Sequence, residues 1–96
     1  MSQLVWTPAA KADIQKHYDY LYARNVDSAD KAVELILAAG KSLARSPKQG
    51  RLIDESAGLR KWPVTFGRYG FVIHYALLAS EVVVLRVYHG RQSRPS

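Results

Sequence analysis

Three strand-like runs in the second half of the chain constrain the fold more than any other feature. Apolar, β-branched and aromatic residues dominate residues 59–64, 69–77 and 82–88. Gly67 falls in the first gap, and the tripeptide Ala-Ser-Glu at 79–81 falls in the second. Gaps this short join antiparallel neighbours, so the sequence predicts an antiparallel three-stranded meander. Pro63 lacks a backbone N–H donor, which places the first of the three strands toward an edge of the sheet.

The first half of the chain carries helical patterns instead. A short apolar piece at 4–6, expected to be a strand, is followed by Thr7-Pro8, which reads as an N-cap and a first helical residue. Apolar residues then recur at helical spacing to about Arg24, and Asn25 is expected to stop this helix.

A second helical pattern follows at once. Asp27 or Ser28 is expected to cap it, and Ser46-Pro47 to end it. Its apolar side is formed by Ala32, Val33, Ile36, Leu37, Gly40 and Leu43. Because the link between the two helices is so short, they should form an antiparallel hairpin.

The order of these elements defines the fold class. Between the second helix and the meander, the stretch KQGRLIDESAG has no helical period and reads as a polar loop. The chain therefore reads β-α-α-β-β-β, an α+β fold with the helical hairpin packed on one face of a small, mainly antiparallel sheet. Its 96 residues suit a single domain spanning 1–96.

Positive charge is concentrated in the second part of the chain. Residues 1–55 carry eight Lys or Arg and seven Asp or Glu, whereas residues 56–96 carry six and one. The net charge is +6. Such a surface attracts polyanions, either nucleic acid or an acidic protein partner, although a charge excess also serves solubility alone.

Several kinds of site and location are not indicated. Cysteine is absent, which rules out disulfides and thiolate metal sites and fits a reducing compartment. His17, His74 and His89 lack ligand spacing, so we expect no metal and no cofactor; His17 should lie on the solvent side of its helix. There is no signal peptide pattern and no apolar run long enough to span a membrane. We therefore expect a soluble, cytoplasmic protein.

The C-terminal stretch LRVYHGRQSR, residues 85–94, combines a buried strand with basic and aromatic side chains. Side chains alternate along a strand, so Arg86 and Tyr88 should share one face, with Leu85, Val87 and His89 on the other. Arg60 and Trp62 should likewise point together. If the helices cover one face of the sheet, the opposite face can gather Arg60, Trp62, Arg86 and Tyr88 into a basic, aromatic surface.

Two chemical interpretations of this surface remain open. Metal-independent RNA cleavage needs groups that move protons and cations that stabilise charge on phosphorus. His89 and Tyr88 could supply the first, and arginines such as Arg86 and Arg60 the second. Arg91 and Arg94 also suit a surface that handles phosphate. The alternative is docking to a target or partner. The candidate binding residues are Arg60, Trp62, Arg68, Arg86, Tyr88, His89 and Arg91.

Five stretches resemble one protein family in the right order along the chain. WTPAAKADIQKHYDYLYARN resembles the opening strand and Tyr-rich first helix of toxins of the ParE/RelE superfamily, and LARSPKQGR resembles the exit of their second helix. GLRKWPV, YGFVIHYAL and VVVLRVYHGRQ resemble their meander and basic C-terminal strand end. The resemblance covers nearly the whole chain and implies the same β-α-α-β-β-β fold.

The resemblance implies a toxin of a bacterial type II toxin–antitoxin module. Such a toxin forms a hetero-oligomeric complex with a cognate, largely acidic antitoxin, whose segment is expected to pair with Arg60, Arg68 and Arg86. ParE-like members act on DNA gyrase and need no catalytic residues, whereas RelE-like members cut mRNA in the ribosome. An adaptor that binds nucleic acid fits the charge but not the family pattern.

The ending RVYHGRQ looks closer to the ParE-like pattern, although Gln92 stands where a second basic residue is frequent. RelE-like nucleases depend on a lysine-rich stretch before the meander. Here that stretch offers only Lys48 and Arg51, and two acidic residues follow it. The resemblance therefore favours a gyrase-directed toxin, with a ribosome-dependent mRNA interferase as the alternative.

Overall fold

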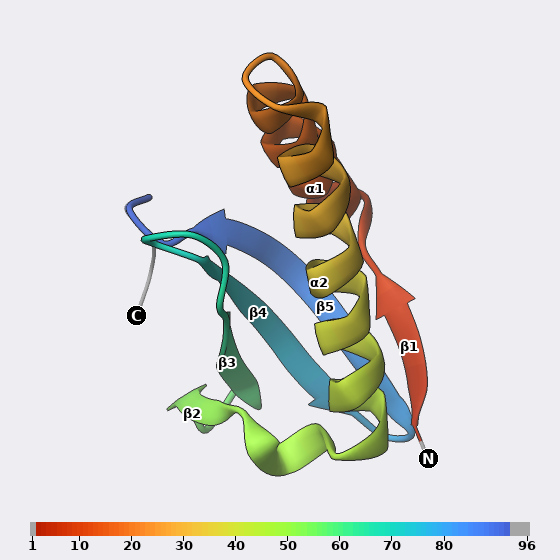
Figure 1. Ribbon diagram of the computed structural model, residues 1–96. Coiled ribbons are helices and arrows are strands. Elements are labelled where there is room, and N and C mark those ends of the chain that lie inside the picture. Colours follow the sequence, from red (N-terminus) through yellow and green to blue (C-terminus); the bar gives the residue numbers. More distant parts are fainter. Residues whose placement is uncertain (1, 93–96) are drawn as a thin grey trace.

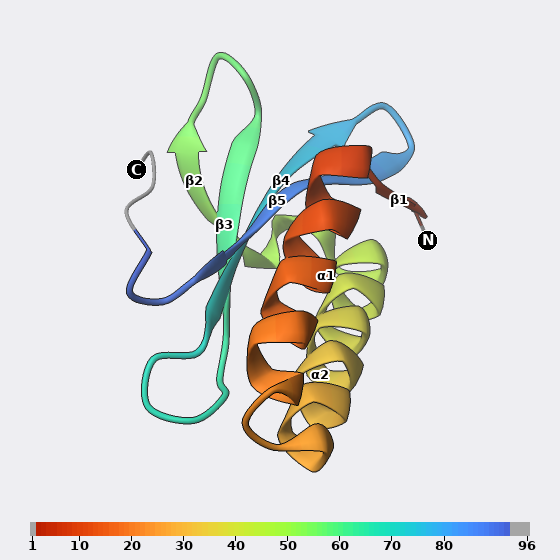
Figure 2. The same ribbon diagram turned by 90° about the horizontal axis from the view of Figure 1, so that it is seen from above.

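Two helices lie on one face of a five-stranded sheet in the computed structural model, which describes residues 2–92 (Figures 1 and 2). The elements in chain order are β1 (Gln3–Trp6), α1 (Pro8–Tyr22), α2 (Val26–Arg45), a 3-10 helix η1 (Pro47–Gln49), β2 (Arg51–Asp54), β3 (Leu59–Val64), β4 (Phe71–Leu78) and β5 (Glu81–His89). The strand order is β1-β5-β4-β3-β2. Only the β1–β5 pair is parallel, so the predicted α+β fold with a mainly antiparallel sheet is confirmed.

The helix boundaries follow from capping residues. Thr7 Oγ1 accepts a hydrogen bond from Ala10 N at 3.1 Å, and Pro8 opens α1, as predicted. Asn25 serves both helices: its N–H donates to Leu21 O at the end of α1, and its side chain accepts from Ser28 N at the start of α2. The predicted cap at Asp27 or Ser28 is therefore wrong, because Asn25 already satisfies the first free N–H group of α2.

The segment after η1 is a strand rather than the predicted loop. β2 pairs with residues 59–61 of β3 at the edge of the sheet. Most of its residues are exposed, so it has no apolar alternation that a sequence pattern could reveal. The buried Tyr75 of β4 positions the segment, since its hydroxyl donates to Pro47 O at 2.6 Å and accepts from Gly50 N at 2.9 Å. Pro63 lies beyond the end of β2, where β3 has no neighbour on that side.

A β-bulge interrupts the pairing of β4 with β5. His74 pairs with Arg86 and Tyr75 pairs with Val84, so Leu85 is an extra residue without a partner. Val84 and Val87 consequently both face the helices, and both are completely buried. The prediction that Leu85, Val87 and His89 continue one alternating face is therefore wrong at Leu85.

The core lies between the helical hairpin and the inner face of the sheet. It is formed by buried residues from both helices and three strands: Ala10, Ala32, Ile36, Leu43, Val64, Phe71, Ile73, Tyr75, Val82, Val84 and Val87. A Cβ at Gly40 would lie 2.5 Å from the Trp6 ring, so any larger residue there would displace this ring where α2 packs against β1. Among residues 2–92, no helix is long and apolar enough to cross a membrane.

Candidate functional site

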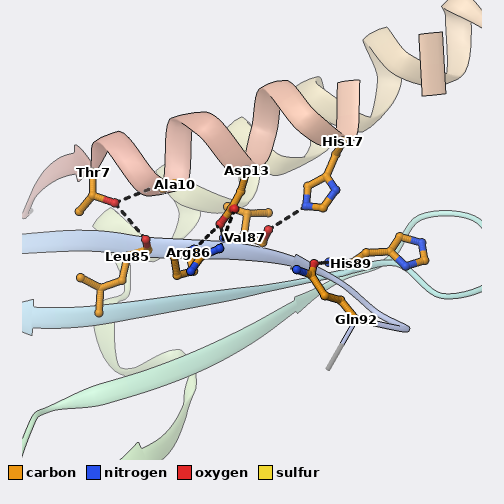
Figure 3. A network of polar contacts seen from close by, with 9 residues as sticks. All are labelled: Thr7, Ala10, Asp13, His17, Leu85, Arg86, Val87, His89 and Gln92. Carbon is orange, nitrogen blue, oxygen red and sulfur yellow. Dashed lines mark hydrogen bonds and ion pairs between the residues drawn. The ribbon is translucent and has the colours of Figure 1, made fainter. Parts of the chain in front are cut away.

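Side chains of α1 close the edge of β5 beyond the end of β1 (Figure 3). β1 pairs with β5 only as far as Val84, which leaves the next backbone groups of β5 without a strand partner. Thr7 Oγ1 donates to Leu85 O at 3.0 Å, and Val87 N donates to Asp13 Oδ2 at 2.9 Å. His17 Nε2 lies 2.7 Å from Val87 O; since a carbonyl only accepts, this nitrogen carries the proton. The helix thus replaces a strand and protects an otherwise open sheet edge.

Asp13 also binds Arg86 through two hydrogen bonds. Arg86 Nε donates to Oδ2 at 2.7 Å and Nη2 donates to Oδ1 at 3.0 Å. Burial by itself raises the pKa of Asp13, but the hydrogen bonds from Arg86 and Val87 and the charge of Arg86 outweigh it. The pKa of this carboxyl therefore lies below its ordinary value. This contact ties the guanidinium of Arg86 to α1.

A hollow of about 400 Å³ lies between α1 and the end of β5. Its lining residues are Lys16, His17, Tyr20, His89, Arg91 and Gln92. The ring centroids of His17 and His89 are 6.5 Å apart, and Phe71 packs against both rings. Of these described lining residues none is acidic, so the hollow is a basic, aromatic site suited to an anionic ligand.

His89 is fixed at the mouth of this hollow by the turn that follows β5. Its Nδ1 accepts a hydrogen bond from Arg91 N at 3.2 Å, and its own N–H donates to Gln92 Oε1 at 3.1 Å. Burial lowers the pKa of His89, and the charges of His17 and Arg91 lower it further. The neutral imidazole is thus the favoured form, with its proton on Nε2.

The predicted gathering of Arg60, Trp62, Arg86 and Tyr88 on one open face is wrong. Arg60 and Trp62 pair with Tyr75 and Ile73, which face the helices. Arg86 and Tyr88 pair with His74 and Val72, which point to the opposite face because side chains alternate along β4. The sequence pattern predicted each pair correctly but could not relate the two strands, because β4 lies between them.

Two of the predicted site residues have structural contacts of their own. Arg60 Nη1 donates to Gly50 O at 2.8 Å and to Lys48 O at 3.3 Å, which ties β3 to the start of β2. Tyr88 is only 7% exposed and packs edge-on against His74, with ring centroids 4.8 Å apart. Neither side chain is in the hollow where His89 and Arg91 lie.

The remaining predicted residues, Arg68, His89 and Arg91, lie together where the turn between β3 and β4 meets the end of β5. The guanidinium groups of Arg68 and Arg91 lie over the ring of Tyr69, at 5.5 Å and 4.9 Å from its centroid. The ring of His89 lies 5.9 Å from the same centroid. Arg94 lies outside the described residues.

Sequence reasoning missed Asp13, Lys16, His17, Tyr20 and Tyr69 as contributors to this region. His17 in particular was expected on the solvent side of α1, yet it bonds to β5. Asp13 and His17 are four residues apart, a spacing that places both on one face of the helix. The sequence did not indicate that this face lies against β5. Among residues 2–92, no three His, Asp or Glu side chains come together as a metal site would require.

Comparison with known families shows where this chain belongs. Residues 4–94 match the family model described as the ParE toxin of the type II toxin–antitoxin system parDE. The chain belongs to the ParE toxin family. It is thus a toxin of a type II toxin–antitoxin module, as its sequence stretches implied.

Two relatives of this ParE-family chain are named as RelE toxins. Toxin RelE3 of Caulobacter vibrioides is 33% identical over 87 residues, which is 91% of this chain and 92% of the relative. Toxin RelE1 of the same organism is 34% identical over 85 residues, covering 88% and 89%.

Solved structures agree with this membership. A chain of the chromosomal ParDE system from P. aeruginosa is 30% identical, with a TM-score of 0.74 and coverage of 93% and 96%. A chain of the RelBE2 toxin–antitoxin complex from Mycobacterium tuberculosis is 25% identical, with a TM-score of 0.55 and coverage of 92% and 96%. The fold of this ParE-family toxin is therefore shared across both branches of the superfamily.

Proposed function

We propose that this ParE-family toxin inhibits DNA gyrase by docking to it, without cleaving RNA. The observation that carries the proposal is that four residues expected to act together in RNA cleavage do not all lie at one site in the structure. They are Arg60, Arg86, Tyr88 and His89. Arg60 and Arg86 lie on opposite faces of the sheet, and each is held by a contact within the chain. Tyr88 is buried away from His89. A metal-independent nuclease needs its base, acid and cations around one phosphate.

Docking to a protein does not require the binding side chains to surround one phosphate. Arg68, Tyr69 and Arg91 are exposed, and Tyr69 adds flat contact area beside two guanidinium groups. Arginine and tyrosine are enriched among the residues that dominate protein interfaces. We place the contact with gyrase at this end of the sheet, with His89 and Arg91 at its centre.

The test measures both activities of one preparation. Purified toxin should inhibit supercoiling of relaxed plasmid by gyrase and leave ribosome-bound mRNA intact. A preparation that cuts mRNA at the ribosome while gyrase supercoils at its normal rate would reverse the assignment.

One observation favours the alternative of a ribosome-dependent mRNA interferase. The hollow brings two imidazoles, His17 and His89, together with Lys16 and Arg91. Imidazoles are the commonest proton-transfer groups of enzymes, and nearby cations can stabilise a phosphorane. In that case His89 and His17 would carry the reaction, and Tyr88 and Arg60 would not.

An acidic antitoxin is the second part of the proposal. Two solved structures similar to this chain come from toxin–antitoxin systems, and residues 56–96 carry six basic residues against one acidic residue. A hollow of about 320 Å³ between α1 and α2, lined by Ile14, Tyr18 and Val33 among others, offers apolar anchors. Such anchors are needed because ordering a flexible segment costs free energy.

Of the three arginines expected to meet antitoxin carboxylates, Arg60 and Arg86 are hydrogen-bonded within the chain, whereas Arg68 is exposed and lies over the ring of Tyr69. We therefore expect Arg68 to contribute most. Co-expression with the product of an adjoining gene should rescue growth and yield a complex. A toxin that is harmless to cells and binds no such product would contradict this assignment.

A further inference from the structure

Two arginines lie over the ring of Tyr69 at one end of the sheet. Arg68 and Tyr69 belong to the turn between β3 and β4, and Arg91 follows β5. All three are exposed, and Tyr69 retains 45% of its surface. We call Arg68, Tyr69 and Arg91 the Tyr69 clamp. A guanidinium stacked on an aromatic ring keeps its N–H groups in the ring's periphery, where they can bind a planar or tetrahedral oxyanion.

The two segments of the Tyr69 clamp are fixed to each other through their backbones. Gly90 N donates to Gly70 O at 2.9 Å, and a Cβ at Gly90 would lie 1.9 Å from Tyr69 O. The turn between β3 and β4 and the end of β5 are thus in direct contact. Because the scaffold and the ring already restrict both arginines, binding an anion costs less side-chain entropy than it would at free surface arginines.

A third cation, Lys16, lines the same hollow as Arg91, between α1 and β5. This hollow has a volume of about 400 Å³, and Tyr20 on its rim is 59% exposed. The acidic residues of the meander, Asp54, Glu55 and Glu81, lie at the turns of the opposite end of the sheet. Among the described residues, the strands and turns at the clamp's end of the sheet carry no acidic side chain that would repel an anionic ligand.

We propose that the Tyr69 clamp and Lys16 bind phosphates of the DNA backbone. This inference rests on the proposed action on gyrase, whose substrate is DNA. Guanidinium forks match phosphate oxygens, and the hollow of about 400 Å³ that Arg91 and Lys16 line has room for a sugar-phosphate unit, which exceeds the size of a carboxylate side chain. Contacts of this kind carry no base information, so the binding is independent of sequence. The contact with DNA then lies at the same end of the sheet as the proposed contact with gyrase.

The experiment measures binding of the full chain to a short fluorescein-labelled DNA duplex by fluorescence anisotropy between about 50 and 200 mM salt. Each neutralised phosphate contributes roughly 0.9 to the slope of log K against log salt. The Arg68→Gln/Arg91→Gln variant should therefore lower the slope by roughly 1.8, and weaken binding by about tenfold or more at low salt. The Lys41→Gln/Arg45→Gln variant removes the same charge at the exposed far end of α2 and should keep the slope.

Three outcomes would overturn the inference: an unchanged slope for the Arg68→Gln/Arg91→Gln variant, tighter binding to RNA of the same sequence, or equal binding of a poly-glutamate chain of matched charge. Thermal unfolding of each variant verifies its fold. Gyrase supercoiling assays run beside these measurements separate the two proposals. Clamp-dependent DNA binding without gyrase inhibition supports the clamp and refutes the proposed function. Gyrase inhibition by a toxin that does not bind DNA refutes the clamp alone.

Discussion

Asp13 on α1 and Arg86 on β5, which lie 73 residues apart in the sequence, form a two-point ion pair with Nε–Oδ2 and Nη2–Oδ1 distances of 2.7 and 3.0 Å. The same carboxylate accepts the N–H of Val87 immediately after the β-bulge. One side chain thus joins the first helix to the last strand and satisfies a backbone donor where no neighbouring strand can.

We expect Asp13→Ala to lower the free energy of unfolding by about 1–3 kcal/mol, because it leaves the Val87 N–H and Arg86 without their acceptor. The loss should not exceed this range, because the Arg86 side chain is 43% exposed, against 11% for Asp13, and solvent screens its charge. Urea denaturation measures the loss. Asp19→Ala on the same helix removes an exposed carboxylate and should change stability by less than about 0.5 kcal/mol. Equal losses in the two variants would contradict the assigned role.

Asp13 should also make stability depend on acid. Its pKa is lower in the folded than in the unfolded chain, so its contribution is present above the unfolded value of about 3.9 and is lost as the pH falls through the lower folded value. The stability difference between the natural chain and Asp13→Asn should therefore shrink below about pH 4. Denaturation series at several pH values measure this difference, and a constant difference down to about pH 2 would contradict it.

His89 should titrate below the ordinary histidine value of about 6.5. Its lowered folded pKa means that its contribution to stability is complete above the unfolded value and is lost as the pH falls through the folded one. NMR titration of the ring protons measures the midpoint directly. Arg91→Gln keeps the backbone N–H that binds His89 Nδ1 but removes a nearby charge, so it should raise the midpoint. A natural chain that titrates above 6.5 would show that burial is not the dominant influence.

His89→Gln distinguishes docking from catalysis. In the docking mode the amide can still donate and accept hydrogen bonds, so gyrase inhibition should weaken by about tenfold at most, and His89→Ala should be the more damaging change. In a nuclease, loss of a proton-transfer group costs about 100-fold or more, and both substitutions would be equally harmful. Inhibition and mRNA cleavage are measured on both variants after their folding has been verified.

Ala79→Gly should stabilise the chain by about 0.5–1 kcal/mol, because Ala79 occupies the turn between β4 and β5 with φ of 50°. Glycine adopts this left-handed backbone without a steric penalty, which outweighs its larger unfolded-state entropy. Ala38→Gly, at an exposed position within α2, should instead cost about 1 kcal/mol. Thermal and urea unfolding of both variants provide the comparison, and a destabilised Ala79→Gly chain would contradict the prediction.

The features that the sequence determined by itself depend on neighbours a few residues apart. Thr7 and Pro8 cap and open α1 through contacts within one turn, and the alternation of apolar residues with the turns at Gly67 and 79–81 defines the meander. The ordered stretches that resembled ParE/RelE toxins are confirmed by the family match over residues 4–94. Two helices followed by antiparallel strands leave little freedom in how the layers pack, so the fold class followed as well.

The tertiary structure decided which side chains meet. β2 is held by pairing and by Tyr75 rather than by an apolar pattern of its own, and the bulge at Leu85 breaks the period of two on which any reading of strand faces depends. Strand register places Arg60 and Arg86 on opposite faces of the sheet, and helix position places Asp13 and His17 against β5. Register and helix position are set by the packing of the whole core, because a local pattern specifies which face of an element is apolar but not which residue of a distant element lies across from it.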